Sequence, residues 1–246
     1  MVIKQLAIPV KLTFKQKKEI APNVWHFVFV PETPFSWKAG QHALFEIPLL
    51  SGKTGRKPFS ISAAPSEGVV SFTTRIYPEH ASPFKQALLK MKAGTRIKLR
   101  GAIGPLHISP TSRRKYAFLA TGIGITPFRS ILTELAHHHS DIKITFFYVG
   151  NKDNHFFKEE MGDVKNALPN VSIVYIYKPE RITGQIIEDT LGNEIPETTF
   201  FLSGSYAMIK TYRRTLTGLG VKRRRIKSDP FFRLKPPHAK EIVNKL

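Results

Sequence analysis

The 246-residue sequence contains no cysteine. This absence excludes disulfides, thiol catalysis and an iron–sulfur cluster held by cysteine, and it is compatible with the cytoplasmic location that we expect. No run of about 18 consecutive apolar residues is present, so we also expect no transmembrane segment. A redox role would therefore have to use an organic cofactor or a metal held by other ligands, and no metal-ligating cluster stands out in the sequence.

Acidic residues are scarce: 18 Asp and Glu stand against 38 Lys and Arg, which gives a formal net charge of +20. The electrostatic field of a net positive charge of this size attracts nucleic acid, acidic membranes, phosphorylated ligands or acidic proteins. The alternative is a generally basic, soluble surface without a specific partner. Residues 1–10 lack a small-residue cleavage site, so we expect no signal peptide and a first strand that starts almost at once.

The first half of the chain is typical of β structure. Short β-branched or aromatic runs, separated by Gly and Pro, predict strands at 10–14, 24–30, 43–47, 60–63, 69–76 and 96–99. Ser82 followed by Pro83 predicts the N-cap and first residue of one helix between them. This spacing favours a small six-stranded antiparallel barrel.

In the second half of the chain the pattern of apolar residues changes. Strands expected at 116–120, 142–149, 171–177 and 198–202 alternate with helices from Pro127, over 156–167 and over 206–219. Such alternation predicts a Rossmann-like parallel sheet with crossover helices. The polar stretch at 110–114 divides the chain into a β-barrel domain (1–110) and an α/β domain (111–246).

The segment from Thr121 to Phe128, Thr-Gly-Ile-Gly-Ile-Thr-Pro-Phe, follows a strand and opens a helix. Gly122 and Gly124 would let the main chain approach a pyrophosphate, and the helix start favours negative charge. Thr126 can cap the helix and offer a hydroxyl. The alternative is a tight turn that holds no ligand.

Two further segments combine residues suited to a bound cofactor. Lys57 and Phe59 share one face of an expected strand, with Ser60 beside them, so a cation for phosphate lies near an aromatic for a flat ring. Ser203, Gly204 and Ser205 form another strand–helix turn, at the edge where ligands bind in open α/β sheets. A basic surface strand and a simple serine N-cap are the respective alternatives.

Five segments in this order resemble the ferredoxin–NADP reductase superfamily, and the resemblance covers nearly the whole chain. Lys57-Pro58-Phe59-Ser60 resembles the Arg-x-Tyr/Phe-Ser/Thr motif of that family's flavin-binding barrel, and Ser82-Pro83-Phe84 resembles its phosphate-binding helix start. The stretch from Thr121 to Pro127 is similar to the Gly-Gly-x-Gly-x-Thr-Pro turn. Residues 203–208 resemble the Cys-Gly-Pro-x-x-Met turn, and 229–231 resemble an acidic residue and aromatic near the end.

The departures concern three positions. Lys57 replaces an arginine and lacks its bidentate fork, so that Arg56 beside it is a second candidate for the phosphate. Thr121 replaces the first glycine of its turn, and Ser203 replaces the cysteine. The chain also lacks the cysteine cluster and the fused haem domain that some members of the family carry.

On the flavin side, the resemblance implies that Phe59 contacts the isoalloxazine ring and that Ser60 lies near its reactive N5. Thr74 and Arg75 would contact the flavin mainly through their backbone, and Ser82 with its helix start would hold the flavin phosphate. Eight residues are thereby assigned to flavin binding: Arg56, Lys57, Pro58, Phe59, Ser60, Thr74, Arg75 and Ser82.

On the nicotinamide side, Ser203, Gly204 and Met208 would shape the nicotinamide pocket, while Asp229 and Phe231 would close the site near the flavin. The resemblance assigns ten residues to dinucleotide binding: Thr121, Gly122, Gly124, Thr126, Pro127, Asn151, Lys152, Ser203, Gly204 and Met208.

Ser60 and Asp229 are the expected catalytic residues, while the flavin carries the hydride chemistry. The resemblance favours FAD over FMN. The choice between NADH and NADPH stays open, because Lys152 suits a 2′-phosphate and Asp153 suits a ribose hydroxyl.

We therefore expect an NAD(P)H-dependent FAD oxidoreductase that passes electrons to an external acceptor. An acidic ferredoxin- or flavodoxin-like carrier would suit the positive charge, and a ferric chelate is the competing acceptor. The alternatives are a basic nucleic-acid-binding module and a flavin sensor without reductase turnover. No nucleic-acid motif is present, and the aromatics lie in strand cores rather than among basic residues.

Overall fold

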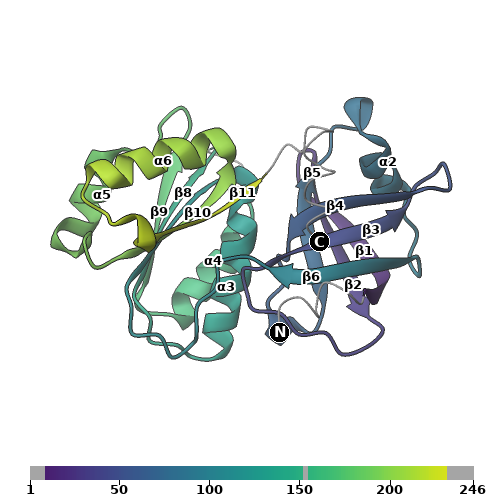
Figure 1. Cartoon of the computed structure of the whole chain (residues 1–246), viewed down its shortest axis with the longest axis horizontal. Coiled ribbons are helices and arrows are strands. Elements are labelled where there is room, and N and C mark those ends of the chain that lie inside the picture. The colour runs from purple at the N-terminus through teal and green to yellow at the C-terminus, as the bar shows by residue number, and fades with distance from the viewer. Residues whose placement is uncertain (1–8, 152–154, 232–246) are drawn as a thin grey trace.

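The computed structural model describes residues 9–151 and 155–231, in which two sheets lie side by side (Figure 1). The expectations for the chain start and for Lys152 and Asp153 fall outside these residues, as does the side chain of Phe231. Among the helices described, none is long and apolar enough to cross a bilayer.

The first sheet is antiparallel and has the order β4-β3-β6-β1-β2-β5. Its strands are β1 Val10–Ala21, β2 Val24–Pro31, β3 His42–Pro48, β4 Thr54–Ser60, β5 Val70–Arg75 and β6 Arg96–Ile103. The short turns η1 Pro65–Glu67 and η2 Pro78–His80 and the helix α2 Pro83–Lys90 connect them. The sheet curls into a half-barrel, which confirms the six-stranded antiparallel prediction (Figure 1).

One strand of the barrel was predicted in the wrong place. A strand was expected at 60–63, whereas β4 covers Thr54–Ser60 and ends where the expected strand begins. Gly55 and Pro58 are poor strand formers, but β4 pairs along its whole length with β3, from Pro48 opposite Thr54 to His42 opposite Ser60. Cross-strand pairing therefore outweighed the local propensity on which the prediction depended.

Phenylalanines fill the interior of the barrel. Phe72 stacks on Phe27 and Phe29, with ring centroids 5.2 and 5.6 Å apart, and meets Phe45 edge-on at 4.7 Å. These rings come from β2, β3 and β5, at alternate positions that share one face of the sheet. The aromatic core thereby fixes the register that positions β4 at the sheet edge.

The second sheet is entirely parallel, with the order β11-β10-β7-β8-β9. Its strands are β7 Tyr116–Thr121, β8 Ile144–Gly150, β9 Val171–Tyr177, β10 Thr199–Ser205 and β11 Ile226–Phe231. Its helices are α3 Thr126–His137, α4 Lys158–Ala167, α5 Gly184–Leu191 and α6 Tyr206–Gly218, with the short turns η3 Gly122–Ile125, η4 Gly192–Glu194 and η5 Arg223–Arg225. The Rossmann-like prediction is confirmed, although α5 was missed.

Two helices cover each face of the parallel sheet. Residues of α3 and α4, such as Phe128 and Met161, share a core with one face, while residues of α5 and α6, such as Ile187 and Leu216, share a core with the other. The strand order reverses at β7, since the chain continues to β8 on one side and later returns to β10 on the other. A reversal of this kind opens a crevice at the carboxyl ends of β7 and β10.

The helix α3 also joins the parallel sheet to the barrel. Arg129 donates to both carboxylate oxygens of Glu67 at 2.6 and 2.9 Å, to the Ser62 carbonyl at 2.9 Å and to Glu160 at 2.7 Å. The neighbouring Ser130 hydroxyl donates to the Ala63 carbonyl at 2.7 Å. We call these contacts of Arg129 and Ser130 the α3 clamp, and they fix the barrel relative to the crevice.

Candidate active site

The turn after β7 packs directly against the end of β10. A Cβ atom added at Gly124 would lie 2.2 Å from the carbonyl oxygen of Ser203. The first requirement for glycine at this position is therefore close packing of the two turns, whereas the sequence had suggested close approach of a pyrophosphate. The two glycine-containing turns line the same crevice because of this contact.

Gly122 has the more open surroundings of the two glycines. Its φ is +55°, and a Cβ there would meet nothing nearer than the Phe156 ring at 3.9 Å. The buried Tyr148 hydroxyl donates to the Gly122 carbonyl at 3.2 Å and accepts from the Phe156 amide at 3.1 Å. Burial raises the pKa of Tyr148, so this hydroxyl stays protonated and holds the turn in place.

The expectation that Thr126 caps the helix is wrong. Thr126 is the first residue of α3, the N-cap is Ile125, and the buried Thr126 hydroxyl donates to the Ile123 carbonyl at 3.0 Å. The 3₁₀ turn η3 places Thr126 one position further along the helix than its capping role required. Pro127 follows it within the buried first turn, and Thr121 ends β7 half-buried.

The turn after β10 contains a buried hydroxyl that the fold does not use. Ser203 is fully buried, and its Oγ has no hydrogen-bond partner among the described residues. Gly204 has φ +154°, and a Cβ there would lie 2.7 Å from the thioether of Met208. Ser205 is the N-cap of α6, where its side chain accepts from the Met208 amide at 3.3 Å.

On the barrel, Lys57 and Ser82 meet at the start of α2. The Lys57 ammonium lies 3.4 Å from the Ser82 hydroxyl and 5.6 Å from the centre of the Phe84 ring. Ser82 is the N-cap and Pro83 the first helical residue, as predicted, although the Ser82 side chain makes no capping bond. Burial lowers the pKa of Lys57, and both burial and the charge of Lys57 lower the pKa of Lys85 in the first turn.

Two half-buried cations and a helix N-terminus thus share one place, and no described carboxylate forms an ion pair with either lysine. Lys85 donates to the Arg75 carbonyl at 2.6 Å, and a helix N-terminus with two ammonium groups beside it favours a bound anion. The donor set fits a phosphate of the kind that a flavin dinucleotide carries.

Arg56 and Pro58 lie on the other face of β4. The Arg56 side chain donates to the buried Glu46 at 2.9 Å, and Glu46 also accepts from Arg100 at 2.7 Å. Since successive residues of a strand point to opposite faces, Arg56 cannot share the face of Lys57. The structure therefore leaves Lys57 as the strand cation beside Ser82.

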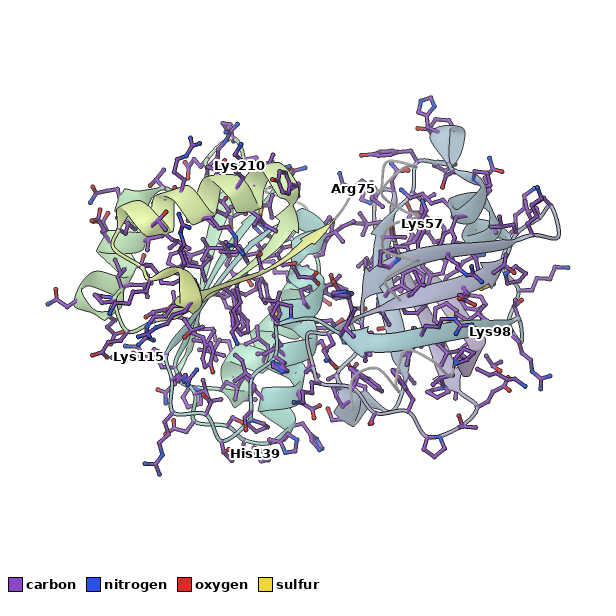
Figure 2. The ribbon with its side chains drawn as sticks, in the orientation of Figure 1. Lys57, Arg75, Lys98, Lys115, His139 and Lys210 are labelled. Carbon is purple, nitrogen blue, oxygen red and sulfur yellow. The ribbon has the colours of Figure 1, made fainter. Side chains whose placement is uncertain are left out.

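Phe59 lies on the same face of β4 as Lys57. Its ring stacks on Phe72 with centroids 4.3 Å apart and an interplanar angle of 10°, while the residue stays partly exposed. Thr74 is buried in β5, and Arg75 ends that strand with an exposed side chain that donates to the Tyr77 hydroxyl at 3.3 Å. Figure 2 shows Arg75 at the edge of the barrel that faces the parallel sheet, and Lys57 over the upper part of the barrel.

The two expected catalytic residues come together although 169 positions separate them. The Ser60 hydroxyl at the end of β4 donates to Asp229 in β11 at 3.4 Å. Both residues are buried, and Asp229 lies opposite Ser203 in the pairing of β10 with β11. The strand β11 reaches from the parallel sheet toward the barrel (Figure 1), so Asp229 connects the nicotinamide-side turn to the flavin-side strand.

The sequence analysis missed His42. Its Nδ1 lies 3.3 Å from Asp229 Oδ1, although the geometry is too poor for a hydrogen bond and Nδ1 otherwise has no partner. The pairing of β3 with β4 places His42 directly opposite Ser60. Its position just after Gly40-Gln41 at a strand start was visible in the sequence, but its partner strand was not.

A second histidine, His155, was also missed. Its ring meets Tyr148, Tyr175 and Tyr177 edge-on, with centroids 4.9 to 5.1 Å apart. Burial lowers the pKa of His155. This aromatic cluster lies after β8, close to the exposed Asn151 that the sequence assigned to the dinucleotide.

Comparison with known proteins agrees with this arrangement. Residues 11–108 match the family model "Oxidoreductase FAD-binding domain", and residues 118–214 match "Oxidoreductase NAD-binding domain". The chain is 25% identical over 166 residues to a plasma membrane-associated coenzyme Q6 reductase of Saccharomyces cerevisiae, covering 65% of this chain and 53% of that protein. It is 26% identical over 192 residues to methane monooxygenase component C of Methylosinus trichosporium, covering 77% and 50%.

The chain spans about half the length of these two relatives. Among solved structures, the FAD/NAD-binding domain of nitric oxide dioxygenase from Vibrio cholerae superposes with a TM-score of 0.77 at 20% identity, covering 90% of this chain and 98% of that one. Ferredoxin-NADP+ reductase from Plasmodium falciparum superposes with a TM-score of 0.76 at 19% identity, covering 92% and 97%.

The barrel is thus an FAD-binding domain and the parallel sheet an NAD-binding domain. The chain belongs to the ferredoxin–NADP reductase superfamily of FAD-dependent oxidoreductases.

Proposed function

We propose that this chain takes electrons from NAD(P)H and passes them through FAD to a separate acceptor. The observation that carries the proposal is the contact between Ser60 and Asp229, which joins the FAD-binding barrel to the dinucleotide crevice at 3.4 Å. A site that transfers hydride between two cofactors requires both to meet at one place, and this contact marks the place where the two halves converge.

The flavin phosphates bind Lys57, Ser82 and the first turn of α2 in this proposal. The fit rests on the two half-buried ammonium groups of Lys57 and Lys85, which no described carboxylate balances. Phe59 offers a partly exposed ring for the flavin, and Thr74 and Arg75 lie at the end of β5, the strand whose Phe72 stacks on that ring. Arg56 has no part in the proposal, because Glu46 holds it on the opposite face.

The dinucleotide enters along Gly122 and the start of α3, and the nicotinamide lies at Ser203, Gly204 and Met208. The open flank of Gly122 allows close approach of a phosphate, and the buried Ser203 hydroxyl is a donor that the protein itself leaves unused. A buried hydroxyl without a partner costs free energy, so a ligand group that bonds to it gains affinity.

When bound, FAD supplies the ring that accepts and donates reducing equivalents. The residues of the chain orient that ring and handle the accompanying proton. Ser60 Oγ holds a proton at the buried end, Asp229 accepts from it, and the partly exposed His42 faces the second Asp229 oxygen. The Ser60–Asp229 hydrogen bond at 3.4 Å and the approach of His42 Nδ1 to Asp229 at 3.3 Å thus line up three groups that can relay a proton from solvent.

The proposed acceptor is an acidic protein carrier, with a small ferric chelate as the competitor. The net charge of +20 and the exposed Arg75 at the end of β5 would speed encounter with an acidic partner. The two relatives differ here, since one is a coenzyme Q6 reductase and the other a monooxygenase component. The cytoplasmic location stays a prediction.

The acceptor is tested by the salt dependence of flavin reoxidation. The second-order rate constant should fall steeply with ionic strength for ferredoxin- or flavodoxin-like carriers, because exposed charges are screened over about 8 Å at physiological salt. An uncharged acceptor serves as the control and should show little change. If the rate constant did not change with ionic strength for any acidic carrier, the positive charge of the protein would not steer the acceptor.

The activity itself is tested on the purified full chain. Flavin absorption bands that an anaerobic nicotinamide donor bleaches would support the proposal, and parallel titrations with NADH and NADPH would identify the preferred donor. Asp229→Asn should slow reduction by about 100-fold while the flavin stays bound. A protein that takes up no FAD would refute the proposal, and a yellow protein that no nicotinamide reduces would favour a flavin sensor.

A further inference from the structure

The outer face of the barrel carries a concentrated basic surface that the proposed activity does not use. A hollow of about 430 Å³ opens there across β1, β3, β4 and β6. Six of its lining residues are cationic: Lys11, Lys53, Arg56, Arg96, Lys98 and Arg100. We call these six residues the basic face. Figure 2 shows Lys98 at the end of the barrel remote from the parallel sheet, so the basic face is separate from the crevice.

The acidic residues at this face are already engaged. Glu46 forms the floor of the hollow, and Arg56 and Arg100 both donate to it. Glu32 pairs with Arg96 at 2.9 Å. Among the described residues, no carboxylate lies within ion-pair distance of the exposed Lys11, Lys53 or Lys98, and Lys11 stands directly opposite Lys98 in the strand pairing. Like charges opposite each other destabilise a sheet, so these lysines favour a bound anion.

An exposed leucine stands at the rim of the basic face. Leu50 is 59% exposed in the turn between β3 and β4, next to Gly52 and Lys53 of the hollow. Two backbone bonds hold the turn, from the Leu49 amide to Lys53 at 2.8 Å and from the Gly52 amide to Leu49 at 3.0 Å. The turn thus holds the exposed Leu50 side chain in place beside the basic face.

We infer that the basic face docks on an anionic phospholipid bilayer, with Leu50 entering between the headgroups. Clusters of four to eight Lys and Arg side chains suit such a surface, and an adjoining apolar side chain adds to the binding. The lining contains no aromatic residue on which the bases of a single-stranded nucleic acid could stack. Lysines are depleted in protein–protein interfaces, whereas half of these cations are lysines. Docking through this face leaves the crevice open to nicotinamide.

The first experiment is co-sedimentation of the flavin-loaded full chain with vesicles. Binding is expected to phosphatidylcholine vesicles that contain one third phosphatidylserine, not to pure phosphatidylcholine, and to weaken as salt rises. The triple variant Lys11→Gln, Lys53→Gln, Lys98→Gln should bind about 100-fold more weakly, since each cation near the surface contributes about fivefold. All three lysines are exposed, so the fold should tolerate the changes.

The matched control removes the same charge elsewhere. Lys165, Lys210 and Lys222 are exposed on the parallel-sheet half, and their triple Gln variant should bind the anionic vesicles nearly as well as the unchanged protein. Equal loss in both triple variants would show that general charge drives binding, and would overturn the assignment to the basic face. Failure of the unchanged protein to bind at low salt would overturn it as well.

The second experiment uses the absence of cysteine. In the variant Leu50→Cys, an environment-sensitive dye attaches at one position only, and its emission should rise when anionic vesicles are added. The same dye in Lys210→Cys should not respond. A silent dye at position 50 would overturn insertion of Leu50, and displacement of the vesicles by an equal concentration of a DNA oligonucleotide would show that the face prefers nucleic acid.

Discussion

Arg129 is a buried cation and Lys57 a half-buried one, and the groups that surround them differ completely. Arg129 in the α3 clamp bonds two carboxylates and a backbone carbonyl, all within 2.9 Å. Although burial acts to lower it, the bonds and charge of Glu67 raise the pKa of Arg129. Lys57 has a serine hydroxyl and a second lysine for neighbours, and burial lowers its pKa.

The two buried serines Ser130 and Ser203 also differ in whether their hydroxyls have hydrogen-bond partners. Ser130 donates to the Ala63 carbonyl and accepts from the Gly40 amide, whereas Ser203 has no partner among the described residues. A polar group that the fold fully satisfies holds the structure together, while one left unsatisfied is available to a ligand. The α3 clamp therefore stabilises the arrangement of the two halves, whereas the unpartnered Ser203 hydroxyl is a candidate contact for the nicotinamide in the proposed function.

The largest effect should follow from Arg129→Met. The change leaves Glu67 partly buried without its partner, which should lower the free energy of unfolding by about 3–5 kcal/mol. Urea unfolding of the full chain measures it. Arg96→Met is the matched control, because Arg96 pairs with Glu32 at the exposed surface, where such a pair contributes about 0–1 kcal/mol. Similar losses in both variants would contradict the structural role of the clamp.

Acid should lower the free energy of unfolding through His26, whose ring meets Phe157 edge-on beside the α3 clamp. Burial and the charge of Arg129 lower the pKa of His26 from 6.5 to about 4. Between these two pH values His26 binds a proton in the unfolded chain but not in the folded chain. The free energy of unfolding therefore falls as the pH drops from 6.5 toward about 4. The loss should be no more than about 3 kcal/mol, because one pKa unit corresponds to about 1.4 kcal/mol.

Urea unfolding at about pH 7 and about pH 4.5 measures this slope. His26→Gln cannot titrate and should show a flatter profile over the same range. Glu67 has a lowered pKa through its bonds to Arg129, although burial acts to raise it, so its own contribution is lost only at lower pH. An unchanged slope in His26→Gln would mean that another group controls the acid sensitivity.

Lys57→Ala should weaken FAD binding by about 10- to 150-fold, which corresponds to the loss of one charged hydrogen bond of about 1.5–3 kcal/mol. Fluorescence titration of the deflavinated chain with FAD measures the change. Arg56→Ala provides the control from the opposite face of β4 and should leave the affinity unchanged. If the two variants lost affinity equally, the phosphate site would not be the one formed by Lys57 and Ser82.

The smallest effect on stability should come from Ser203→Ala, which removes a hydroxyl without a partner. The free energy of unfolding should stay constant or rise by up to about 1 kcal/mol, while the concentration of nicotinamide donor needed for half-maximal flavin reduction should increase. Ser130→Ala, at an equally buried serine, should instead cost about 1–2 kcal/mol and leave the nicotinamide affinity unchanged. The reverse pattern would refute the distinction between satisfied and unsatisfied groups.

The sequence determined the class of each half, because strand and helix periods are local properties. It predicted the six-stranded barrel, the alternating parallel sheet and the Ser82–Pro83 helix start, and it placed glycines at the turns after β7 and β10. Lys57 and Phe59, two positions apart, lie on one face of a strand as expected, for the same reason. The position of β4 was predicted wrongly because its strand character depends on pairing with β3.

Only the tertiary structure decided which distant residues meet and which polar groups keep a partner. His42, Ser60 and Asp229 come from β3, β4 and β11, and nothing in their local sequence shows that they converge. Arg56 and Lys57 are neighbours with similar charge, yet Glu46 on the adjacent strand pairs with Arg56, while Lys57 on the opposite face lies beside Ser82. Gly124 likewise makes room for a carbonyl 79 positions along the chain, because close packing depends on the folded arrangement of both turns.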